Sequence, residues 1–245
     1  MKPMTVFGIV IGFLSISAAA HQLVLAKSSA QSTQPYAPVI DPANFVTKVD
    51  HPYFPLKPGT TRIFEGKIEA GFEHEEVVIS ANTKVIMGVT CVTVTDTVTI
   101  DGKLKEATTD WYSQDKQGNV WYFGEDSKDY QDGKVVSTKG SWLAGVNGAL
   151  PGYVMKANPK VGETYRQEYY KGEAEDWATI MSLNESATVP QGSYKNIWMT
   201  KDWAALENPP VFEYKYYAKG IGQIMTTGGT GKNSWKISLV EIQSK

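Results

Sequence analysis

The sequence predicts a mainly β protein: a single domain built on a curved antiparallel sheet with meander connections and one short helix. Residues 92–100 alternate apolar β-branched side chains with threonines, so that Val92 and Val94 share one face. This period of two is typical of a strand with one buried and one wetter face. Asp-Gly pairs at 101–102 and 132–133 supply hairpin turns at a short spacing that suits antiparallel neighbours and leaves no room for parallel crossovers.

The other strands follow from similar patterns. Residues 60–68 alternate imperfectly, and residues 76–80 form a short β-branched run ahead of a meander that spans residues 91–138. Within this meander, the strands expected after 92–100 are 106–114, 120–124 and 135–136. Beyond Pro159 the strand-like segments are 163–170, 185–189, 197–200, 211–218, 223–227 and 235–242. The run 174–182 (AEDWATIMS) is the best helix candidate, and we predict the single short helix there.

The first twenty residues predict export. A lysine at position 2 is followed by an almost continuous apolar run over 6–16 and by alanines at 18–20. These are the three parts of a secretory signal, and the apolar run is too short to cross a bilayer stably. We therefore expect a secreted or periplasmic protein.

Three segments divide the chain. Residues 1–20 are the expected signal peptide, and residues 21–44, rich in Ser, Gln, Pro and Ala, are the expected flexible tether. Residues 45–245 are the expected β-rich domain, which is long enough to bury a hydrophobic core of its own.

Composition narrows the classes of partner. The chain has 24 basic and 26 acidic residues and no basic stripe, which argues against nucleic acid and anionic membrane surfaces. Cys91 is the only cysteine, so no internal disulfide forms, and the three histidines show no metal-ligand spacing. We expect no metal, no cofactor and no stable membrane insertion, while a protein partner stays open.

The main functional clue is the density of aromatic residues in the meander. Adjacent residues of a strand point to opposite faces, so Trp111 and Tyr112 do not enter one core, and neither do Trp121 and Tyr122. One member of each pair then faces a second surface, where its ring is suited to stacking on a sugar or another flat ligand. Packing of both faces by a second sheet or by loops is the alternative.

Acidic residues accompany these aromatics. Asp110 shares the face of Tyr112, and Glu125 lies where the returning strand is expected to end. Both carboxylates are suited to orienting a ligand through hydrogen bonds, as in pockets that join apolar walls to a few polar groups. We predict a non-catalytic binding protein for a saccharide or another flat, amphipathic small molecule, with the ligand held by Trp111, Tyr112, Trp121, Tyr122, Asp110 and Glu125.

Two other classes of function stay open. A cell-envelope hydrolase or lyase acting on carbohydrates needs two carboxylates that converge across an aromatic cleft, at least one of them desolvated. The candidates for that pair are Asp110, Glu125, Glu168 and Glu175. A structural or assembly protein would instead offer a sheet edge to a partner strand. The acidic run 125–132 lacks the spacing of a Ca²⁺-binding EF-hand, which favours a solvated turn.

Three motifs resemble those of a group of secreted bacterial β-rich proteins of unknown function. Residues 53–59 (YFPLKPG) resemble the opening of their domain, residues 121–125 (WYFGE) an internal block, and residues 216–222 (YYAKGIG) the closing strand pair. The resemblance spans most of residues 50–243. It implies one folded unit with a curved antiparallel sheet, and it implies no catalytic residue.

Overall fold

The computed structural model describes residues 36–244, so the expected signal peptide and residues 21–35 of the expected tether lie outside the described part of the chain. The described residues form strands β1 to β18 and two short 3₁₀ helices, η1 (Pro42–Asn44) and η2 (Gly231–Asn233), with no α-helix among them. The predicted mainly β fold is therefore confirmed. Neither described helix is long and apolar enough to cross a membrane.

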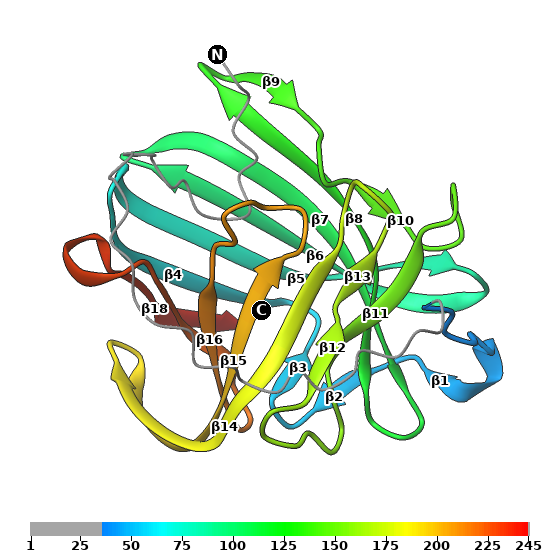
Figure 1. Cartoon of the computed structure of the whole chain (residues 1–245). Helices are drawn as coiled ribbons and strands as arrows, with labels where there is room; N and C mark the ends of the chain where they lie inside the picture. The colour runs from blue at the N-terminus through cyan, green and yellow to red at the C-terminus, as the bar shows by residue number, and fades with distance from the viewer. Residues whose placement is uncertain (1–35, 245) are drawn as a thin grey trace, which may run out of the picture.

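Most strands belong to one antiparallel sheet that curves into a barrel (Figure 1). Each long strand is hydrogen bonded to the next one in a continuous order. In that order they are β14 (Asp176–Val189), β15 (Gly192–Ala204), β16 (Glu213–Ala218), β17 (Gly222–Gly228), β18 (Trp235–Ser244), β4 (Thr60–Ile68), β5 (Gly71–Ile86), β6 (Val89–Ile100), β7 (Lys103–Asp115), β8 (Val120–Gln131) and β11 (Leu150–Met155).

The two ends of this order meet in one bent segment. β12 (Thr164–Arg166) pairs with β14, and β13 (Glu168–Tyr169) pairs with β11. Between them, the backbone N–H of Gln167 donates to the carbonyl of Asp176 at 2.8 Å. Because one segment pairs with both edges, the sheet nearly closes and encloses the side chains of its inner face. Figure 1 shows β14 to β16 in front of β5 to β8, on the other side of the interior.

The meander predicted over residues 91–138 is confirmed by β6 to β9 (Lys134–Ser137), where each strand pairs with its neighbour in sequence. Asp101 and Gly102, between β6 and β7, have φ angles of 50° and 73°, as a two-residue hairpin turn requires. β8, however, continues to Gln131, so the solvated turn expected over residues 125–132 is wrong. Residues 125–129 pair with β7, and their side chains alternate between the two faces of the sheet.

The helix predicted at 174–182 is also wrong. Most of this run belongs to β14, which pairs with β12 on one side and β15 on the other. Ala178 and Ile180 are buried on the same face, whereas Trp177 and Thr179 lie on the opposite, more exposed face. Burial with a period of two and hydrogen bonds to both neighbours outweigh the weak helix propensity of a short segment.

The YFPLKPG motif supplies the second strand of a separate hairpin at one end of the barrel (Figure 1). This hairpin pairs β2 (Val49–His51) with β3 (Phe54–Leu56) and packs against side chains of the barrel interior. Phe54 contacts Tyr112 edge-on, with ring centroids 5.4 Å apart. An Arg62 guanidinium N–H donates to the carbonyl of Pro55 at 2.6 Å. The motif therefore blocks one end of the barrel rather than only leading into a strand.

The remaining short strands extend the wall beside β7 and β8. They are β1 (Phe45–Val46), which pairs with β7, and β9 (Lys134–Ser137) and β10 (Trp142–Leu143), which pair with β8. Residues 36–44, which we assigned to the tether, also contact the barrel, since the Tyr36 hydroxyl donates to the carbonyl of Pro151 at 2.7 Å. Ile40 packs against a buried cluster on the outside of the sheet.

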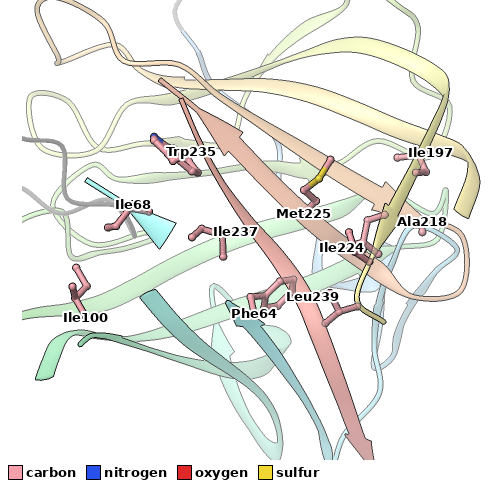
Figure 2. Close-up of a cluster of buried hydrophobic side chains, with 11 residues drawn as sticks. Phe64, Ile68, Ile100, Ile197, Ala218, Ile224, Met225, Trp235, Ile237 and Leu239 are labelled. Atoms are coloured by element: carbon pink, nitrogen blue, oxygen red, sulfur yellow. The ribbon is translucent and has the colours of Figure 1, made fainter. Parts of the chain in front are cut away.

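A large apolar cluster joins β4, β17 and β18 to the end of the β14–β15 hairpin (Figure 2). Within it, Leu239 pairs with Phe64, and Ile237 lies two residues before Leu239 on the same strand face. These side chains are buried and form the apolar part of the barrel interior. Their burial, at about 25 cal/mol per Å² of apolar surface, is a main source of the stability of a fold without cross-links.

Candidate binding site inside the barrel

Cross-strand pairing identifies the residues that line the barrel interior. Directly paired residues of an antiparallel sheet share a face. Val92 of β6 pairs with Tyr112 of β7, which pairs in turn with Tyr122 of β8. Asp110, two residues before Tyr112, pairs with Glu125. Tyr112, Tyr122, Asp110 and Glu125 therefore lie together on the inner face, as parity predicted for Asp110 and Tyr112.

Trp111 and Trp121 lie on the outer face and are packed. Their exposed fractions are 8% and 7%. The Trp121 indole N–H donates to Asp115 Oδ2 at 2.9 Å, and Lys84 Nζ lies 3.6 Å from the centre of the Trp111 ring. Phe45 of the N-terminal segment covers the Trp121 ring edge-on. The sequence left open the alternative that both faces of the sheet are packed, and this packing accounts for both tryptophans. The two tryptophans therefore lie on the opposite face from Asp110, Tyr112, Tyr122 and Glu125.

Tyr122 connects the two predicted carboxyl groups. Its hydroxyl lies 2.5 Å from Asp110 Oδ1 and 3.0 Å from Glu125 Oε2. A phenol has one proton to donate, so both contacts are hydrogen bonds only when one of the carboxyl groups is itself protonated and donates to the phenol oxygen. Asp110, Tyr122 and Glu125 therefore share protons as one unit.

Aromatic rings surround this unit. Tyr112 stacks on Tyr122 with centroids 4.8 Å apart and planes inclined by 17°. Trp142 of β10, which pairs with Glu125, approaches Tyr122 edge-on at 5.3 Å. These rings reduce the contact of the carboxyl groups with water. Burial accordingly raises the pKa of Asp110 to about 7, although the hydrogen bond from Tyr122 opposes this shift.

Glu125 is affected in the same direction. Burial is the first cause of its raised pKa, and the nearby Asp110 carboxylate is the second, because two like charges at close range oppose each other's ionisation. The hydrogen bond from Tyr122 favours the ionised form but does not compensate. The pair therefore keeps a proton to a higher pH than isolated carboxyl groups do.

The inner face carries many more carboxyl groups than we predicted. They come from strands on both sides of the barrel: Glu73 and Glu75 (β5), Asp96 (β6), Glu106 and Asp129 (β7 and β8), Glu168 (β13), Asp176 (β14), Asp202 (β15) and Glu213 (β16). Burial raises the pKa of most of them, for example to about 7 for Glu106 and Glu213 and to about 8 for Glu73.

Some of these residues carry a signal that was open to sequence reasoning. Asp96 occupies the valine phase of the 92–100 strand, and an acidic residue at a phase that is otherwise apolar points to a polar interior. Glu73 and Glu75 give no such signal, because the residues that follow them, His74 and Glu76, are polar as well. Asp202 and Glu213 pair only after a loop, so their meeting depends on register.

The candidates for a catalytic pair divide between the two faces. Glu168 lies on the inside, and its raised pKa reflects burial and the charges of Asp176 and Glu125. Glu175 lies outside this group and forms an ion pair with Arg166, with Oε2 3.3 Å from Nη1. Arg166 in turn lies over the ring of Trp177, 4.2 Å from its centre.

Lys215 is a basic residue at the centre of these acids. It pairs across the strands with Thr200, and its Nζ lies 3.4 Å from Asp202 Oδ2. Burial opposes the charge on Lys215, but the negative charges of Asp202 and Glu213 outweigh burial and hold its pKa above the ordinary value. Arg62 also faces inward and is engaged with the Pro55 carbonyl at the hairpin end.

Side chains do not completely fill the interior around Lys215 and Tyr122. Lys215 is surrounded by protein, yet 31% of its side chain is accessible to water. Tyr112, Tyr122 and Glu125 are likewise only partly buried, although they lie on the inner face of the sheet. Side chains that face inward and keep accessible surface line an internal space. Within residues 36–244, no three His, Cys, Asp or Glu side chains come together closely enough to hold a metal ion.

Comparison with known proteins gives two similar solved structures. No protein-family model matches the chain, and no curated protein matches it. A Bacteroides fragilis protein, considered exported and assigned a YmcC-like fold, has a TM-score of 0.48 and 13% identity, covering 78% of this chain and 99% of its own. A Parabacteroides distasonis protein, considered a lipoprotein, has a TM-score of 0.42 and 12% identity, covering 78% of this chain and 98% of its own.

Proposed function

We propose that the chain is an exported, non-catalytic binding protein that holds an amphipathic small molecule inside the barrel. One observation carries the proposal: Tyr112 and Tyr122, with Asp110 and Glu125, lie together on the inner face, and all of them except Asp110 keep surface that is accessible to water. Ring surface beside hydrogen-bonding carboxyl groups is the composition of a small-molecule site. The signal sequence expected at residues 1–20 supports a location outside the cytoplasm.

The inner rings support an amphipathic ligand. Phe64 and Leu239, on the opposite part of the inner face, are packed in the core with exposed fractions of 2% and 0%, so they offer no surface to a ligand. The apolar part of a ligand would instead lie against Tyr112 and Tyr122, and its polar part beside Asp110 and Glu125. Trp111 and Trp121 do not belong to the proposed site, since their rings are packed on the outer face.

Carbohydrate hydrolysis is the second candidate, and the unit of Asp110, Tyr122 and Glu125 is the observation that favours it. Its shared proton leaves one carboxyl group protonated and the other able to ionise, as an acid–base pair requires. Binding ranks first because of the geometry of the two carboxyl groups. In a glycosidase the scissile bond lies between the two carboxyl groups. Here both groups come from adjacent strands of one wall, and the Tyr122 hydroxyl already lies between them.

An assembly role has less support. Such a protein would offer an unpaired strand edge to its partner, and the segment Thr164–Tyr169 covers both edges of the described sheet by pairing with β11 and β14.

A ligand screen tests the proposed function. The purified protein is titrated with mono- and oligosaccharides and with N-phenyl-1-naphthylamine, a flat neutral amphiphile, while thermal stability and probe fluorescence are followed. For any ligand that binds, Tyr112→Leu should weaken the affinity about tenfold, equivalent to ~1.4 kcal/mol, because it removes an inner ring. Tyr214→Leu is the matched control, since Tyr214 pairs with Lys201 on the outer face.

Two results would contradict the proposed function. One is that no compound binds. The other is that Tyr112→Leu and Tyr214→Leu weaken binding equally. Hydrolysis of an oligosaccharide that is lost in Glu125→Gln and kept in Glu175→Gln would favour the second candidate instead.

A further inference from the structure

We propose that the ligand held by this interior is a small organic polyamine, an elongated molecule with two or more ammonium groups. The inference rests on the proposed function and adds the chemical class of the ligand. It is carried by the arrangement of carboxyl groups around the internal space, by their unpartnered oxygens and by the aromatic rings between them.

The carboxyl groups converge on the space from several sides. The charge of Lys215 acts on Glu75 of β5, on Asp110 of β7 and on Asp176 of β14, so these three groups surround the same region although their strands lie on different sides of the barrel. Lys215 is the ammonium group that the protein itself supplies there, paired with Asp202. One ammonium leaves most of the surrounding carboxyl groups without a cation.

Buried oxygens of these groups lack hydrogen-bond donors. Glu73 Oε2, Glu106 Oε2 and Asp202 Oδ1 have no partner within the described chain, although the exposed fractions of these residues are only 1%, 8% and 5%. An ionised carboxylate only accepts hydrogen bonds, and an ammonium group only donates them, so an amine supplies what these atoms lack.

The spacing favours an organic amine over a metal ion. No three potential ligands of the described residues lie close enough together to hold one ion. The acidic groups are instead spread along the inner wall with Tyr112, Tyr122 and Trp142 among them. Aromatic faces attract ammonium groups, and they pack against the methylene segments that separate the charges of a polyamine.

Calorimetric titration with spermidine and putrescine tests this inference. Experiments in 150 mM salt screen attraction to surface charges. We expect spermidine to bind with one-to-one stoichiometry and 1,4-butanediol, a neutral analogue of putrescine, not to bind. The double variant Asp110→Asn/Glu125→Gln, which keeps side-chain shape, should weaken spermidine binding at least tenfold.

A matched control lies on the same strand as Glu125. Asp126→Asn changes the residue next to Glu125, but Asp126 pairs with Thr109 on the outer face and contacts Lys128. It should change the affinity less than twofold, as should Glu175→Gln. Glu213→Gln, on the opposite wall, is a second interior variant if the double variant does not fold by circular dichroism, and it should also weaken binding.

Several outcomes would overturn the polyamine assignment. Absence of spermidine and putrescine binding would do so, as would equal losses in the inner and outer variants, which would indicate surface attraction. Ca²⁺ that displaces spermidine and depends on the same inner residues would replace the polyamine with a metal ion. A neutral amphiphile that depends on Tyr112, without amine binding, would overturn this inference and leave the proposed function standing. If the inner variants changed the binding of no probe, both the polyamine assignment and the proposed function would be contradicted.

Discussion

Tyr122 shows at the scale of one residue how the interior tolerates buried acids. Its hydroxyl hydrogen bonds to Asp110 and Glu125, which would otherwise face each other across neighbouring strands without a donor. A buried carboxyl group that loses its partner costs about 1–3 kcal/mol. The phenol therefore stabilises this pair of carboxyl groups.

Tyr122→Phe tests this role. We expect the free energy of unfolding in urea to fall by about 1–3 kcal/mol at pH 7, because both carboxyl groups lose the shared hydroxyl. Tyr112→Phe is the control, since its hydroxyl makes no hydrogen bond to another described residue, and it should cost less than 0.5 kcal/mol, about the effect of a neutral substitution. Equal losses in the two variants would contradict the assignment.

Residue parity explains which part of the site was predictable. The opposite orientations of Trp111 and Tyr112 follow from the two-residue period of a strand, and the structure places them on opposite faces. The two-residue period alone does not show which face of the sheet lines the barrel interior. Phe45 covers Trp121 from a distant part of the chain, and Asp202 meets Glu213 only through strand register, so neither contact is encoded locally.

At the scale of elements, the acidic strands predict an unusual dependence of stability on pH. Burial raises the folded-state pKa of several inner groups. The pKa is about 7 for Glu106, Asp110, Asp176 and Glu213 and about 8 for Glu73. An acid with a raised folded pKa binds more protons in the folded state. Its contribution to stability is complete below the pKa of the unfolded state, about 4, and is lost as the pH rises through the pKa of the folded state.

We therefore expect the urea midpoint to fall from pH 5 to about pH 7 and to level off above the folded pKa values of these groups. Urea unfolding at pH 5, 6, 7 and 8 measures it. Asp110→Asn/Glu125→Gln should flatten the decrease, because amides do not titrate in this range. A protein that becomes more stable between pH 5 and pH 8 would show that the inner carboxyl groups are ionised and stabilised.

The hairpin of β2 and β3 makes a second prediction at this scale. Phe54 contacts Tyr112 and Tyr217 inside the barrel, with ring centroids 5.4 and 6.3 Å away. Phe54→Ala should lower the free energy of unfolding by about 2–4 kcal/mol, somewhat less than a fully buried phenylalanine. Phe72→Ala, at a side chain that is 48% exposed, should have little effect in the same urea titration. Similar losses would mean that the hairpin does not block the barrel end.

Element prediction succeeded where turns and alternation were strong. Asp101-Gly102 and the 92–100 alternation identified the β6–β7 hairpin, and β4 occupies the predicted range Thr60–Ile68. It failed where the period was ambiguous: residues 174–182 are too short to separate helix from strand, and the acidic composition of 125–131 hid a strand. A run of charged residues indicates a turn only when the buried face of the strands is apolar. Here the inner face is acidic, so a charged run can be a strand.

The whole molecule depends on sheet closure and apolar packing rather than on cross-links. Cys91 is buried and free, and Phe64, Ile237 and Leu239 belong to a core that neither reductant nor chelator affects. Dithiothreitol or EDTA should therefore leave the thermal midpoint within about 1 °C, less than the shift that 1 kcal/mol produces in a protein of this size. A fall of several degrees in EDTA that Ca²⁺ alone restores would show that the inner carboxyl groups hold a metal ion.

One comparison tests most directly whether ligands bind inside the barrel. Glu125 and Asp126 are adjacent on β8, yet Glu125 faces Asp110 in the interior, and Asp126 pairs with Lys128 outside. The affinity of the tightest ligand from the screens is measured by calorimetry for Glu125→Gln and Asp126→Asn, with folding of both checked by circular dichroism. We expect about tenfold weaker binding in Glu125→Gln, equivalent to ~1.4 kcal/mol, and unchanged binding in Asp126→Asn. Unchanged binding in Glu125→Gln, or an equal loss in both variants, would contradict an interior site.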